Sequence, residues 1–184
     1  MEISVKTAKV YDLIQSKANS NQLMQGISGA LGFPFTLVVD AGVIFTHYGP
    51  MLNDIRKIFG RDSISGEVVT PVLKGCTSEI LADLVFDKVI GQIPLIGIGA
   101  NIMCAKTMTW RLGLIFAMLS ARGEEISVDS VRNTTKAIRQ MFPQRNMFSF
   151  KAPSIATVNA LLNAFTDISI ENFDSKVDQI LASL

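Results

Sequence analysis

Residues 89–121 read VIGQIPLIGIGANIMCAKTMTWRLGLIFAMLSA, and the charged side chains in this stretch are Lys106 and Arg111. Exposed apolar surface is unfavourable in proportion to its area, so a run of this kind has to be hidden from water. A run that is apolar all round is typical of a helix that is covered by other helices or enters a membrane. We therefore expect this stretch to form part of a central apolar helical hairpin that ends at Arg122-Gly123.

A second apolar stretch precedes it. Residues 18–53 contain one side chain with a full charge, Asp40, and the single histidine of the chain, His47. Residues 37–43 are rich in β-branched side chains, but the apolar run around them is longer than a typical strand of about 5–6 residues. All 13 glycines lie within residues 26–123. The middle of the chain is thus apolar, glycine-rich and almost uncharged.

Helical periodicity predicts an all-α fold, a compact multi-helix bundle with a central apolar glycine-rich helical hairpin. The chain is expected to turn at residues 92–94 and to be loosened further by Gly97 and Gly99. Gly49-Pro50 should kink the helix that contains it. The helices are expected at about 4–17, 20–31, 34–59, 66–91, 100–121, 128–142, 155–165 and 169–184.

Residues that favour helix ends fix these boundaries. Hydroxyl and amide side chains cap the N-termini of helices, and glycine commonly follows the last helical residue. The expected residues at helix starts are Asn19 or Ser20, Ser63 or Ser65, Ser127, Ser154 and Ser169. The expected C-terminal glycines are Gly60 and Gly123.

The 184-residue length suits a single all-α domain, 1–184, with an N-terminal helix in 1–23, the apolar core in 24–123 and amphipathic helices in 124–184. A content of 48% hydrophobic and 18% charged residues excludes a disordered chain. A net charge of +1 gives no basic field, so no nucleic-acid partner is expected. Two cysteines are too few for a disulfide scaffold and the first residues do not resemble a secretion signal, which favours an intracellular protein.

Two interpretations of the apolar middle remain open. Residues 31–46 and 89–105 are 16 and 17 residues long, short of the roughly 20 that a membrane-spanning helix needs. Asp40 in the first segment and Pro94 in the second also disfavour clean spans. The segments either form a shallow hairpin in a membrane or are covered by other helices, and their length favours the covered helices.

Asp40, His47 and Arg111 form the candidate polar site. A carboxylate among apolar neighbours must find a partner or remain protonated, and Arg111 is a suitable partner for Asp40. His47 lies seven residues after Asp40 and so shares roughly one helix face with it. One histidine with one carboxylate makes neither a metal site nor a nucleophilic triad, and no phosphate-binding loop motif occurs. We therefore expect no catalytic residues, no cofactor, no metal and no enzymatic activity.

Trp110, Phe148 and Phe150 form the candidate interface. Trp110 lies where apolar sequence meets Arg111, a position typical either of a membrane-interface anchor or of a core residue. Phe148 and Phe150 belong to residues 139–151, where basic and aromatic side chains alternate. Such a segment contacts anionic lipid or RNA in some proteins, but its few charges favour a loop that packs on the bundle.

The two cysteines have a simpler interpretation. Cys76 and Cys104 lack metal-ligand partners at suitable spacing, so we expect both to be small buried apolar groups.

The order and spacing of two motifs over residues 24–122 resemble those of the uncharacterised YcjF-like helical family, whose domains accompany Era-like small GTPases. The resemblance implies a membrane-associated or GTPase-coupled helical module. Tyr48 departs from the glutamine usual in that family, and these 184 residues do not include a GTPase domain. The matching residues are Phe33-Pro34, Asp40, Met51 and Phe59-Gly60, then Ile93-Pro94-Leu95-Ile96-Gly97, Thr107 or Thr109, and Leu112-Gly113.

These observations favour a non-enzymatic helical interaction module that buries an apolar hairpin in itself or in an oligomeric assembly. Its expected partners are further copies of the chain or a larger protein assembly. The alternative, which follows from the family resemblance, is a membrane-associated regulatory partner of a separate small GTPase. The first function predicts a cytoplasmic protein and the second a protein bound peripherally to a membrane surface.

Substitutions of Asp40 test whether its surroundings are apolar. Asp40→Ala should be tolerated or mildly destabilising, whereas Asp40→Lys should prevent folding because a long cation replaces a carboxylate in apolar surroundings. Thermal unfolding followed by circular dichroism measures both. Equal stability of the lysine variant and the wild type would place residue 40 in water.

Overall fold

The chain folds as a bundle of α-helices, which confirms the predicted all-α class. The computed structural model describes residues 2–28, 41–76, 80, 94–141, 150–166 and 179. Within these ranges there are six helices and no strand. The helices are α1 (Val5–Ser28), α3 (Ala41–Ile58), α4 (Gly66–Gly75), α6 (Pro94–Arg122), α7 (Val128–Met141) and α8 (Ile155–Thr166).

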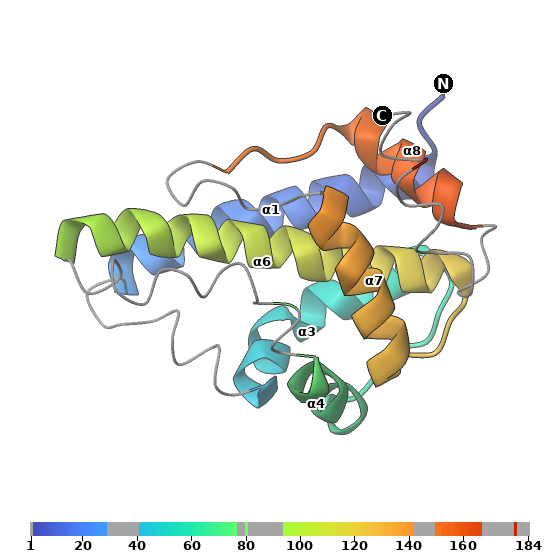
Figure 1. The fold of residues 1–184 in the computed structure, drawn as a ribbon, viewed down its shortest axis with the longest axis horizontal. Helices are drawn as coiled ribbons and strands as arrows, with labels where there is room; N and C mark the ends of the chain where they lie inside the picture. Colours follow the sequence, from blue (N-terminus) through green and yellow to red (C-terminus); the bar gives the residue numbers. More distant parts are fainter. Residues whose placement is uncertain are drawn as a thin grey trace.

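Helix α6 is the centre of the bundle. It runs along the long axis of the molecule, with α1 beside it in the opposite direction (Figure 1). Helices α3, α7 and α8 also pack against it. Every residue of the segment 107–120 is buried in consequence. This part of the apolar stretch is hidden by other helices of the same chain, as the covered-helix interpretation expects.

Helix α1 contributes one apolar stripe to this core. Val10, Ile14 and Ala18 are buried and spaced four residues apart, so they lie on one face of the helix. Ile14 packs directly over Gly113 of α6. A Cβ atom on Gly113 would lie 2.5 Å from Cγ1 and 2.6 Å from Cδ1 of Ile14. The missing side chain at Gly113 therefore allows α1 to approach α6 closely.

Three helices begin with the same hydroxyl pair. In each, the N-cap serine accepts a hydrogen bond from the backbone N–H three residues later and also bonds the hydroxyl of that residue. The structure confirms the predicted caps Ser127 and Ser154 and adds Ser4. The N–H to Oγ distances are 3.1 Å for Thr7 to Ser4, 3.1 Å for Ser130 to Ser127 and 3.1 Å for Thr157 to Ser154.

The predicted glycines at the C-terminal ends of two helices are confirmed. Gly60 and Gly123 follow α3 and α6 with φ angles of 73° and 74°, which glycine adopts without strain. The N–H of Arg61 bonds the carbonyl of Arg56 at 2.9 Å, and the N–H of Glu124 bonds that of Leu119 at 3.0 Å. These bonds satisfy carbonyl groups at the helix ends.

The predicted break between helices at residues 18–20 is wrong, because α1 continues through it to Ser28. Ser20 uses its hydroxyl to bond the carbonyl of Lys17 at 2.9 Å, within the preceding turn. Asn19 accepts a hydrogen bond from Gln15 at 3.2 Å, one turn earlier. Both side chains bond backward along the helix, so neither caps a new one.

Two other boundaries differ from expectation. Helix α6 begins at Pro94, so Gly97 and Gly99 lie inside a helix and not in a loosened turn. Proline is favoured in the first turn of a helix because its missing N–H has no partner there. The helix expected at 66–91 ends at Gly75, where Cys76 leaves the helical conformation with φ −114° and ψ 7°.

Some predicted features cannot be compared with the structure. Helix α3 contains Pro50 within its span, and the predicted residues 34–40 of that helix lie outside the described residues. The same holds for 81–91 and for nearly all of the helix expected at 169–184. Of the two arms of the predicted hairpin, only parts are described.

Replacement of Gly113 by alanine tests the close approach of α1 and α6. The new methyl group collides with Ile14, so Gly113→Ala should destabilise the protein by about 1–3 kcal/mol, although alanine is favoured over glycine in helices by about 1 kcal/mol. In an Ile14→Ala background the collision is gone, and the same change should be neutral or stabilising. Urea unfolding of all four proteins measures the coupling, and equal effects in both backgrounds would contradict the contact.

Candidate functional site

The predicted site residues fall into three groups. Asp40 and Phe148 lie outside the described residues, so the predicted contact of Asp40 with Arg111 is not tested. Arg111 and Trp110 are buried on α6, with exposed fractions of 1% and 3%. His47 is half-buried on α3. Phe150 is partly buried against the core.

Trp110 and Phe150 belong to the inside of this chain. The ring of Trp110 makes an edge contact with Tyr11 of α1, with 5.3 Å between the ring centroids. Trp110, Arg111 and Phe150 also border one small pocket between α6, α7 and the segment before α8. This pocket has room for at most one water molecule. The core role of Trp110, rather than an anchor at a membrane, is favoured.

Arg111 places a guanidinium group inside the bundle. Its Nη1 donates to the backbone carbonyl of Ile80 at 3.1 Å. A buried cation requires hydrogen-bond partners, because its removal from water is costly. Arg111 thereby joins α6 to the chain that follows α4, over 31 residues of sequence.

His47 lies in a cluster that the sequence did not reveal. Its ring makes an edge contact with Tyr48, with 4.8 Å between centroids, and Lys17 of α1 places its Nζ 5.9 Å from the centre of the same tyrosine ring. The Thr109 hydroxyl of α6 lies 3.5 Å from the phenol oxygen of Tyr48. Three helices therefore meet at Tyr48, which is only 1% exposed.

The cluster disfavours positive charge. Burial lowers the pKa of His47 below its usual 6.5, and the charge of Lys17 lowers this pKa further. Burial also lowers the pKa of the Lys17 ammonium. The lowered pKa of His47 means that its contribution to stability is present above pH 6.5 and is lost as pH falls through the folded-state value.

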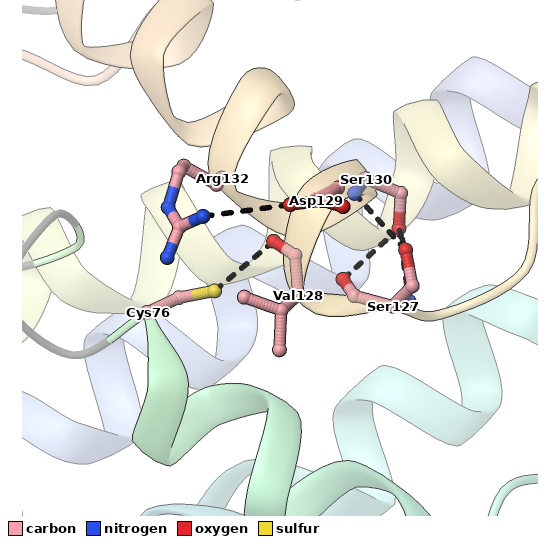
Figure 2. A network of polar contacts seen from close by, with 6 residues as sticks. All are labelled: Cys76, Ser127, Val128, Asp129, Ser130 and Arg132. Carbon is pink, nitrogen blue, oxygen red and sulfur yellow. Dashed lines mark hydrogen bonds and ion pairs between the residues drawn. The ribbon is translucent and has the colours of Figure 1, made fainter.

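A second polar cluster joins α4 to α7 (Figure 2). Buried Cys76 donates its thiol hydrogen to the carbonyl of Val128 at 3.3 Å, and Val128 also contacts Gly75. Ser127 and Ser130 cap the same helix end. The Asp129–Arg132 pair is exposed, and surface pairs contribute little to stability. The cluster is structural, and the buried position of Cys76 is the expected one; the side chain of Cys104 lies outside the described part.

Asn159 is a further polar residue that sequence reasoning missed. It is fully buried on α8, where its Oδ1 accepts hydrogen bonds from the N–H of Ser4 at 3.2 Å and from the hydroxyl of Thr7 at 3.0 Å. Its Nδ2 donates to the carbonyl of Glu2 at 3.2 Å. One side chain thus holds the beginning of α1 against α8.

Comparison of the chain with protein-family models, curated proteins and solved structures gave no match. The resemblance to the YcjF-like family stays a prediction. Across the part of the chain that the structure describes, no group of three or more histidine, cysteine or acidic side chains could hold a metal ion. Among the same residues, no helix is both long and apolar enough to cross a membrane.

The pKa of His47 tests the arrangement around Tyr48. Lys17→Gln should raise it, because one cation is removed, but should leave it below 6.5, because burial is the larger cause. His47 is the only histidine, so its imidazole signals can be followed by NMR without ambiguity. Lys9→Gln removes a charge from an exposed position of the same helix and serves as control. An equal rise in both variants would place Lys17 away from His47.

Proposed function

We propose that the chain is a non-enzymatic helical interaction module that hides its glycine-rich middle partly within itself and partly against further copies of the chain. The first half of this proposal is supported by α6, whose residues 107–120 are buried by other helices of the same chain. The burial against further copies concerns the apolar stretches that lie outside residues 107–120.

Association with further copies is supported by the position at which the apolar stretches join the bundle. Helices α7 and α8 cover the half of α6 near its C-terminus, whereas the first turns of α6 lie beside the last turns of α1 (Figure 1). Residues 29–39, which follow α1, carry no charge, and neither do residues 89–105, which lead into and begin α6. Two uncharged stretches therefore meet the bundle at one end, away from α7 and α8.

An apolar end of this kind is a suitable contact for a second copy. Monomeric proteins rarely expose large contiguous apolar patches, and interfaces between identical subunits are commonly apolar. A net charge of +1 opposes self-association only weakly.

The sequence offers little for catalysis. It contains one histidine and two cysteines, of which Cys76 is buried and bonded to Val128. The buried polar groups Arg111 and Asn159 make hydrogen bonds that join segments of the fold. These roles support an interaction function over an enzymatic one.

The mass of the chain in solution tests the proposal. Light scattering over a range of concentrations, without detergent, should give a mass above 20.0 kDa for the wild type. Leu95→Glu and Ile98→Glu, in the first turns of α6, should each shift the mass toward the monomer. Val5→Glu, at a side chain that is 70% exposed in α1, should leave it unchanged. Circular dichroism must show that the variants remain helical.

A 20.0 kDa mass for the wild type at all concentrations would contradict self-association. If that monomer also sediments with lipid vesicles, the alternative function as a membrane-associated regulatory partner of a small GTPase takes its place.

A further inference from the structure

Lys17 and His47 come from different helices and meet at one tyrosine ring. Lys17 of α1 places Nζ 5.9 Å from the centre of the Tyr48 ring, and the His47 ring meets Tyr48 at 87° with 4.8 Å between centroids. Tyr48 is buried, while Lys17 and His47 are both partly exposed. The rigid, buried ring of Tyr48 therefore lies next to the partly exposed side chains of Lys17 and His47.

The charge of Lys17 opposes protonation of His47. Lys17 and His47 are both partly buried, which lowers the pKa of each, and the charge of Lys17 lowers the pKa of His47 further. Among the ion pairs found in the described residues, none involves Lys17. The pairs include Asp54–Lys57 in the last turns of α3, Arg122–Glu124 at the end of α6 and Asp129–Arg132 in α7.

We propose that Lys17 and His47 together bind a small oxyanion, such as sulfate or a phosphate group, at the surface beside Tyr48. The Lys17 ammonium and a ring N–H of protonated His47 would donate to separate oxygens of the anion, and charge-assisted bonds of this kind are about twice as strong as neutral ones. This inference does not rest on self-association, since both residues belong to one chain.

Binding is expected to depend on pH. An oxyanion favours the imidazolium form, so it must raise the pKa of His47, and by linkage it binds more tightly as pH falls and His47 becomes protonated. The charged group that acts on His47 from α1 is Lys17, and the phenol of Tyr48, bonded to Thr109 of α6, is the neighbouring titratable group on α3.

The test is an NMR titration of the single histidine in sulfate and in chloride at equal ionic strength. Sulfate keeps the same charge between about pH 5 and 8, so any dependence of its binding on pH arises from titration of the protein. Chloride controls for screening, which also raises the pKa of His47 by weakening the repulsion from Lys17. We expect a larger rise in sulfate than in chloride for the wild type and for the control Lys9→Gln.

In Lys17→Gln the excess rise in sulfate should be lost, because one of the two donors is gone. Equal shifts in sulfate and chloride for the wild type would overturn the proposal, and so would an excess that survives in Lys17→Gln. Because the readout is a titration and not a mass, failure here is distinct from failure of self-association.

A second arm identifies the source of the oxyanion. The sulfate-dependent shift is measured again with phosphatidylcholine vesicles, with and without phosphatidic acid. Displacement of sulfate by the phosphatidic acid vesicles alone would assign the site to a lipid phosphate, and no displacement would assign it to a free anion. Either result upholds the oxyanion site.

Discussion

Burial of residues 107–120 of α6 from all sides is the constraint on which the other contacts depend. A fully buried leucine, isoleucine or phenylalanine stabilises a fold by about 1.5–3 kcal/mol, and α6 contributes Leu112, Leu114, Ile115, Phe116 and Leu119 to the core. Because these side chains point in all directions around the helix, no single neighbour can cover them. Helices α1, α3, α7 and α8 each cover one side, and their placement follows from that need.

Several hydroxyl groups that enter this core are satisfied by short-range bonds. Buried Thr109 donates to the carbonyl of Ala105 at 2.7 Å, and Thr135 donates to that of Val131 at 2.6 Å, one turn earlier in the same helix. Such bonds let a hydroxyl be buried without a partner from another helix. Long-range bonds, such as those of Arg111 and Asn159, occur where helices or loops have to be joined.

The sequence allowed prediction of those features that depend on local chemistry. The all-α class, the caps at Ser127 and Ser154 and the stops at Gly60 and Gly123 are local, and all are confirmed. Ser20 was misassigned because a serine hydroxyl can bond forward as a cap or backward within a helix, and residue identity does not distinguish the two.

The candidate site was less predictable, because its contacts join helices far apart in sequence. Lys17 meets Tyr48 only through the packing of α1 on α3, and the spacing of His47 from Asp40 carries no information about it. Native-state hydrogen exchange can determine whether α6 is the buried centre of the fold. Amides of residues 107–120 should exchange only through global unfolding and should be the slowest of the chain. Exchange there as fast as at residues 2–9 would show that α6 is not the buried centre.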